Sequence, residues 1–174
     1  MKIKKILVIR FSSIGDIVLT SPVVRNLKTQ LPDAEVHYCT KKSFHPILKA
    51  NPYIDKIHLL DKDLSALIGD LQREGYDYIV DLHNNLRTRI IKTKLKAKSA
   101  SFNKLNLEKW LMVNLKINKL PNVHIVDRYM ETVGPLSIKM DSLGLDYFIP
   151  DNENVDISSL PQPFQKEYVA FAIG

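Results

Sequence analysis

The stretch Ile6-Leu7-Val8-Ile9-Arg10-Phe11-Ser12-Ser13-Ile14-Gly15-Asp16 decides the fold of this chain. Its four consecutive apolar residues, Ile6 to Ile9, are typical of a strand that is covered on both faces in a parallel sheet. A polar turn follows, and apolar residues then recur at helical spacing until Pro32, where the helix stops. The stretch therefore predicts one strand-to-helix step of an α/β domain.

The same step recurs along the chain. The regular alternation predicts a Rossmann-like, doubly wound α/β domain with a mainly parallel sheet and helices on both faces. We expect this domain to occupy residues 1–145. Further strands are expected at residues 35–39, 56–60, 78–82 and 99–102, and helices at residues 17–31, 43–50, 64–74, 86–95, 105–115 and 123–134.

The last thirty residues change in character. Pro150, Pro161 and Pro163 frame an irregular acidic stretch, which predicts a linker at residues 146–166. The apolar run that follows is typical of a new buried strand. We therefore expect residues 167–174 to be the first strand of a second, C-terminal domain that this sequence lacks.

Composition limits the class of protein. A chain of 174 residues with 45% hydrophobic residues can bury one core, which excludes global disorder. The formal charge of +6 favours anionic partners. Cys39 is the single cysteine and cannot form an internal disulfide, which favours the cytoplasm. No apolar run is long enough to span a membrane, so any membrane contact is expected to be peripheral.

The turn after the first strand is the first candidate site, because ligands of open α/β sheets bind at the carboxyl ends of the strands. Ser13 and Asp16 have the spacing of a capping box, and spacing alone favours that interpretation. Asp16 could instead project into the crevice as a general base. Gly15 is also explained by turn chemistry. The dinucleotide and P-loop fingerprints are missing, which argues against oxidoreductases and NTPases.

A second constellation, Asp81 to Arg89, follows the strand at residues 78–82. Four of its side chains could bind sugar hydroxyls, or a phosphate at the start of the next helix. A capped helix with a solvated basic face explains them equally well. No aromatic residues are interleaved with the basic residues, which argues against nucleic acid. The four side chains are His83, Asn84, Asn85 and Arg87.

Three weaker signals favour structural interpretations. His124 and Arg128 share one face of a predicted helix, where packing is the simpler explanation. Asp61-Lys62-Asp63 has the pattern of a metal-binding D-x-D motif, but its place before a helix favours capping. The histidines show no metal-ligand spacing, so no metal is predicted. These histidines are His37, His45 and His58.

The run Ile6–Pro22 resembles the opening motif of the heptosyltransferase family, glycosyltransferase family nine. The segments 80–88 and 124–129 also resemble that family. The resemblance covers essentially all of this chain, which corresponds to about half of a family member. It implies the GT-B architecture of two Rossmann-like domains facing a cleft, with this chain as the N-terminal, acceptor-binding half. The resemblance also implies that the second domain, expected to begin at residues 167–174, binds the nucleotide-sugar.

The resemblance also implies a reaction. The family is metal-independent and inverting, and it transfers heptose from an ADP-activated donor to the inner core of lipopolysaccharide. Asp16 matches the catalytic base, in a loop shaped by Ser12, Ser13 and Gly15. Acceptor-binding positions are matched by His83, Asn84, Asn85 and Arg87, and more weakly by His124 and Arg128.

The implied partners are the ADP-sugar, as a substrate rather than a cofactor, and an anionic glycolipid acceptor, the phosphorylated lipid A inner core. Contact with the inner face of the inner membrane and no binding to nucleic acid are also implied. Asn84 and Asn85 stand where many relatives carry glycine, so the acceptor could differ, and so could the sugar. The fragment alone is expected to be inactive. The alternative is a non-catalytic Rossmann-like module that binds an anionic sugar or nucleotide.

Overall fold

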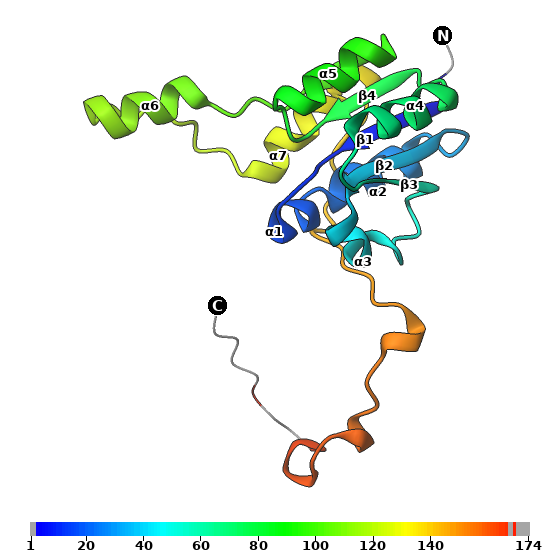
Figure 1. Cartoon of the computed structure of the whole chain (residues 1–174). Helices are drawn as coiled ribbons and strands as arrows, with labels where there is room; N and C mark the ends of the chain where they lie inside the picture. Colours follow the sequence, from blue (N-terminus) through cyan, green and yellow to red (C-terminus); the bar gives the residue numbers. More distant parts are fainter. Residues whose placement is uncertain (1–2, 167–168, 170–174) are drawn as a thin grey trace.

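The computed structural model describes residues 3–166 and 169, and within them five parallel strands form one sheet (Figure 1). The strand order is β3-β2-β1-β4-β5, so the chain reverses its direction of travel across the sheet beside β1. The predicted Rossmann-like, doubly wound class is confirmed. The strands are β1 (Lys5–Ile9), β2 (Glu35–Lys41), β3 (Lys56–Leu60), β4 (Tyr78–Asp81) and β5 (Lys98–Ser101).

Helices cover both faces of the sheet. Two of them, α4 and α5, pack on one face, while α2, α7 and the 3-10 helix η2 pack on the other (Figure 1). The helices are α1 (Ile14–Val18), α2 (Ser21–Gln30), α3 (His45–Leu48), α4 (Leu64–Glu74), α5 (Leu86–Leu95), α6 (Asn106–Leu115) and α7 (Ile125–Met130), with 3-10 helices η1 (Lys42–Phe44) and η2 (Glu131–Leu136).

The central strand explains why the first apolar run has no polar interruption. Ile6 and Val8 belong to the core on the α2 side, and Leu7 and Ile9 belong to the core on the α4 side. All four side chains are fully buried. Burial of each such side chain stabilises the fold by about 1.5–3 kcal/mol, so β1 fixes both layers of the domain.

One predicted helix is wrong in detail, because residues 17–31 form part of two helices, α1 and α2. The hydroxyl group of Thr20 donates to the carbonyl of Ile17 at 2.6 Å and lies 2.9 Å from the hydroxyl of Tyr38. Pro22 has no N–H group with which to continue the hydrogen-bond ladder. The chain therefore turns at Thr20 and restarts as α2. The helix expected at residues 123–134 is likewise shorter and passes from α7 into η2.

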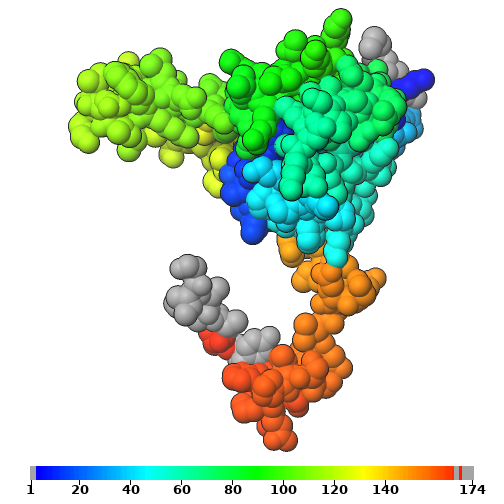
Figure 2. All heavy atoms as spheres, viewed as in Figure 1, coloured from blue at the N-terminus to red at the C-terminus, as the bar shows by residue number. Residues whose placement is uncertain are grey.

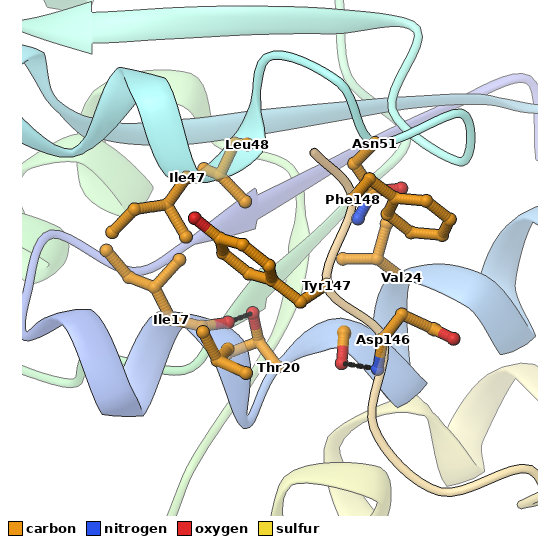
Figure 3. A pocket seen from close by; sticks show the side chains of 11 residues that line it. Ile17, Thr20, Val24, Ile47, Leu48, Asn51, Asp146, Tyr147 and Phe148 are labelled. Carbon is orange, nitrogen blue, oxygen red and sulfur yellow. Dashed lines mark hydrogen bonds between the residues drawn. The ribbon is translucent and has the colours of Figure 1, made fainter. Parts of the chain in front are cut away.

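Residues 146–149 lie against the domain. Figure 3 shows the ring of Tyr147 against Ile17, Ile47 and Leu48, in a pocket between α1, α2 and α3. Phe148 packs on Tyr53 with ring centroids 5.9 Å apart. These contacts tie the segment that follows η2 back to the first half of the chain.

Beyond this point the chain leaves the domain, apart from an ion pair between Glu153 and Lys49 (Figure 1). Residues 150–166 hold three short 3-10 helices and no buried residue. They are η3 (Asp151–Glu153), η4 (Ile157–Ser159) and η5 (Gln162–Phe164). The assignment of residues 146–166 as an interdomain linker stays a prediction. The strand predicted at residues 167–174 lies outside the described residues, apart from position 169.

Candidate functional site

The loops after β1 and β4 meet at the carboxyl edge of the sheet. Ile9 and Asp81 are partners in the register of the two strands, and the N–H of Leu82 donates to the carbonyl of Ile9 at 3.0 Å. The rings of Phe11 and His83 contact edge to face, with centroids 5.5 Å apart. The two predicted constellations therefore lie side by side, at the point of chain reversal where open α/β sheets bind ligands.

Arg10 connects the two loops. Its side chain is 8% exposed, and it donates from Nε to the carbonyl of Ser12 at 2.7 Å and from Nη1 to the carbonyl of Leu82 at 2.5 Å. Its Nη2 atom forms an ion pair with Oδ2 of Asp16, and its guanidinium carbon lies 5.8 Å from the ring centroid of Tyr129. Sequence reasoning missed this residue. The available signal was a charged side chain directly after a buried strand.

Asp16 is both a helix cap and a partly exposed carboxylate. Its Oδ2 atom accepts hydrogen bonds from the Ser13 backbone N–H at 3.1 Å and the Ser13 hydroxyl at 2.9 Å, which confirms the predicted capping. Partial burial raises the pKa of Asp16, but the Ser13 hydrogen bonds and the charge of Arg10 outweigh it. The pKa therefore lies below its ordinary value, so the carboxylate is ionised at neutral pH.

The surroundings of Asp16 are open. Gly15 is exposed, and a side chain at that position would meet no other atom within 4 Å. Ser13 is exposed and Ser12 is half-buried, and the peptide bond that joins them is cis. The loop is thus open to solvent beside Gly15, one residue before the proposed base.

The second loop is shaped by Asp81, which is fully buried. Its Oδ1 atom accepts the backbone N–H groups of His83 at 3.1 Å and Asn84 at 2.7 Å, while Oδ2 lies 2.8 Å from Nζ of Lys92. Asn84 adopts a left-handed conformation with φ of 45°. Asparagine is one of the few residues that tolerates this region, and glycine is another.

The side chains of Asn84 and Asn85 form hydrogen bonds within the protein. The amide of Asn84 donates to the carbonyl of Phe102 at 2.8 Å. The side chain of Asn85 accepts the N–H of Thr88 at 3.0 Å, so the predicted cap at the start of α5 is confirmed. Both groups are therefore engaged within the protein, and this limits what they can offer to a ligand.

His83 and Arg87 are the remaining members of this constellation. His83 is half-buried, and its Nδ1 atom has no hydrogen-bond partner among the described residues. Burial, together with the nearby charges of Arg10 and Lys104, lowers the pKa of His83 to about 4, so its ring is neutral at neutral pH. Arg87 is exposed on the first turn of α5.

The third predicted cluster packs against the domain. Nδ1 of His124 accepts the N–H of Val126 at 3.3 Å and so caps α7. The guanidinium carbon of Arg128 lies 4.8 Å from the ring centroid of Phe102, and the same side chain donates to the carbonyl of Asn103. Arg128 thus packs on the domain as expected, whereas His124 is exposed and caps the helix, and α7 reaches Arg10 through Tyr129 instead.

Two groups of side chains of the types that bind metals have different roles in the structure. Oδ1 of Asp63 accepts the N–H groups of Ser65 and Ala66 at the start of α4, as predicted for a cap. By contrast, His37, His58 and Glu74 come together although their spacing gave no sign of it.

The three side chains of this cluster already have partners within the protein. The hydroxyl of Tyr76 lies 2.9 Å from Nδ1 of His37 and 3.0 Å from Nε2 of His58. Glu74 pairs with Lys5 and Lys56. That the protein binds no metal stays a prediction.

Comparison with known proteins supports the family resemblance seen in the sequence motifs. No protein-family model matches the chain. It is 28% identical over 135 residues to lipopolysaccharide heptosyltransferase 1 of Campylobacter coli, and 26% identical over 138 residues to lipopolysaccharide heptosyltransferase 3 of Escherichia coli. These alignments cover 72% and 71% of this chain. The resemblance expected from the sequence motifs is confirmed, but the chain spans only 40% of the length of either relative.

Solved structures support the same fold. A glycosyl transferase of family 9 from Veillonella parvula superposes with a TM-score of 0.67 at 21% identity, over 87% of this chain and 47% of that one. An E. coli heptosyltransferase with ADP gives a TM-score of 0.63 at 19% identity, over 83% of this chain and 51% of that one. The five-stranded domain therefore has the fold of about half of each of these enzymes.

Proposed function

We propose that this chain is the acceptor-binding part of a glycosyltransferase of the heptosyltransferase family, acting in lipopolysaccharide core synthesis. The donor would be an ADP-sugar, held mainly by a part of the protein outside this sequence, and the acceptor an inner-core saccharide on lipid A. The observation that carries the proposal is the ionised carboxylate of Asp16, which lies at the point of chain reversal beside β1. The two curated heptosyltransferases support the same reaction class.

The reaction would be a single displacement. A hydroxyl oxygen of the acceptor attacks the anomeric carbon while the bond from that carbon to the diphosphate oxygen breaks on the opposite face. The electron pair leaves with the nucleoside diphosphate, and Asp16 accepts the hydroxyl proton. Its lowered pKa makes Asp16 a weak base. It would therefore act late, once bond formation has made the attacking hydroxyl acidic.

Positive charge beside Asp16 supports an anionic acceptor. Arg10, Lys104 and Lys41 all act electrostatically on His83. Arg87 is exposed on the adjoining turn of α5. A phosphorylated sugar would meet these charges while its reacting hydroxyl faces Asp16. In this arrangement His83 and Arg87 contact the acceptor, whereas Ser12, Ser13, Asn84 and Asn85 shape the loops.

The test is transfer from an ADP-sugar to a lipopolysaccharide precursor by a chain extended past Gly174. We expect Asp16→Asn to abolish turnover while leaving donor binding intact. Asp63→Asn is the matched control, because Asp63 caps α4 without being at the site. Asparagine caps a helix about as well as aspartate, so neither change should cost much cap stability, but only the first should stop transfer.

The alternative is a module that binds an anionic sugar or nucleotide without catalysis. It is favoured by the cap and ion pair that already engage Asp16. In that case the extended chain shows no turnover, and Asp16→Asn changes ligand affinity no more than Asp63→Asn does. That result would refute the transferase proposal.

A further inference from the structure

The α6 helix is unlike the other α-helices of the described chain, because none of its residues is buried. Figure 1 shows it projecting from the domain on two connecting segments, and Figure 2 shows that no other part of the described chain covers it on the visible face. We refer to residues 103–124, which comprise α6 and these segments, as the α6 arm. Its exposed large apolar side chains are Leu107, Trp110, Met112, Val113, Leu115, Ile117 and Val123.

This apolar surface is too large to be incidental. Six of the ten residues of α6 are apolar, and Trp110 and Val113 are 53% and 67% exposed. Contiguous exposed apolar surface on a protein marks a place where a partner or a membrane binds. The arm therefore has a partner that the domain itself does not provide.

The charge of the arm identifies the class of partner. Residues 86–119 hold ten basic residues and one acidic residue, Glu108, while the rest of the chain holds 15 basic and 18 acidic residues. The net positive charge of the protein is thus carried by α5, β5 and the arm. Within the arm, lysines flank the apolar side chains at positions 104, 109, 116 and 119. Lysine stems can lie along apolar surface while their ammonium groups reach phosphate.

We propose that the α6 arm inserts its apolar side chains into the headgroup region of an anionic phospholipid bilayer. An exposed helix with apolar side chains and a tryptophan, flanked by lysines, has the features of an interfacial membrane-binding segment. A second copy of the chain fits less well. Two identical arms would bring their lysines together, and protein interfaces are depleted of lysine.

The arm is firmly tied to the candidate site. The N–H of Phe102 donates to the carbonyl of Asp81 at 2.8 Å, and the amide of Asn84 donates back to Phe102. Just after the arm, in α7, Arg128 donates to the carbonyl of Asn103 at the start of the arm. If the proposed function holds, an arm in the bilayer would place the loop of His83 near a lipid-linked acceptor. The lipid contact itself does not depend on that function.

Trp110 provides a direct test, because it is the only tryptophan in the sequence. Vesicles of phosphatidylglycerol should shift its fluorescence to the blue, and brominated acyl chains should quench it. Vesicles of phosphatidylcholine should do so far less, and salt should weaken the effect because it screens the lysines. Val113→Asp should weaken vesicle binding at least about tenfold. Leu143→Asp, at an equally exposed leucine outside the arm, should leave binding unchanged.

Three results would overturn the proposal. The first is no response of Trp110 to phosphatidylglycerol. The second is a blue shift that grows with protein concentration in the absence of lipid, which would show that the arm binds a second copy of the chain. The third is loss of the response in a chain extended past Gly174, which would assign the arm to the rest of the protein. Transfer to a delipidated, soluble acceptor should be the same in Val113→Asp, so failure of the lipid contact and failure of the transferase proposal are distinguishable.

Discussion

Nη2 of Arg10 lies 2.5 Å from Oδ2 of Asp16, and the same guanidinium group binds the carbonyl of Leu82. One nearly buried side chain therefore holds both the proposed base and the turn that carries His83. This arrangement sets the charge of Asp16 and the distance between the two loops together. A change at Arg10 should affect both properties at once.

We expect Arg10→Met to raise the pKa of Asp16 relative to the wild-type protein, because the charge that stabilises the carboxylate is lost. It should also lower the free energy of unfolding by about 3 kcal/mol, since the buried carbonyl of Leu82 and the part-buried carbonyl of Ser12 lose their donor. Carbon-detected NMR titration and urea unfolding measure the two effects. Arg89→Met, at an exposed position on α5, is the control and should change neither. An unchanged titration of Asp16 in Arg10→Met would contradict the assigned role.

The left-handed backbone at Asn84 gives a second prediction. Asn84→Gly and Asn84→Ala both lose the hydrogen bond to the carbonyl of Phe102, so their difference isolates the backbone. The glycine variant should be more stable by about 1 kcal/mol, because alanine resists a positive φ. Thermal unfolding of the two variants side by side measures this. Equal stabilities would mean that the turn relaxes out of the left-handed region.

The parts of the fold that depend on neighbouring residues were predictable from the sequence. The unbroken run Ile6–Ile9 predicts a strand buried on both faces, and the caps at Asp16, Asp63 and Asn85 follow from spacings of three residues or fewer. The break at Thr20 was missed, since helical spacing of apolar residues continues across a two-residue interruption.

Contacts between distant segments were not predictable. Arg10 bonds to Leu82, 72 residues along the chain, so its role depends on the pairing of β1 with β4. The exposure of α6 was also missed, because an apolar helix is ordinarily expected to be buried.

The histidine cluster depends on register in the same way. His37 and His58 approach each other only because β2 and β3 pair with Cys39 opposite His58. Glu74 and Tyr76 reach them from the end of α4 and the residues just after it. No spacing within one segment could reveal this network.

The cluster predicts how stability changes with pH. Burial lowers the pKa of His37, and burial together with the charge of His37 lowers that of His58 from 6.5 to about 4. In the unfolded chain both take up protons near pH 6.5, so the unfolded state binds more protons between pH 6.5 and 4. Stability from this source is therefore complete above pH 6.5 and is lost as the pH falls toward 4. The loss from His58 amounts to about 3 kcal/mol.

Urea unfolding at a series of pH values between 7 and 4 measures this loss. His58→Gln should show a shallower decline than the wild-type protein, because glutamine takes up no proton. His83→Gln removes a half-buried histidine outside the cluster and should keep the contribution of the cluster. If His58→Gln declines as steeply as the wild-type protein, the loss arises elsewhere.

Arg25 gives the last prediction, because it ties the segment after η2 to the domain. Its side chain is 1% exposed, and it pairs with Asp141 and Asp146 and donates to the carbonyl of Gly144. Arg25→Met leaves two carboxylates without their partner and should cost about 3–5 kcal/mol. Asp141→Asn should cost less, since Arg25 keeps its other two partners.

Acid unfolding tests the same pairing independently. The hydrogen bond from Arg25 lowers the pKa of Asp141 to about 2. Stability from this pair is therefore present above the ordinary value of 3.8 and is lost as the pH falls toward 2. Arg25→Met should lose most of this acid dependence, because the largest cause of the lowered pKa of Asp141 is removed and only weaker hydrogen bonds, such as that from the Leu143 N–H, remain. A loss of the same size in both proteins would show that Arg25 does not hold the segment through Asp141.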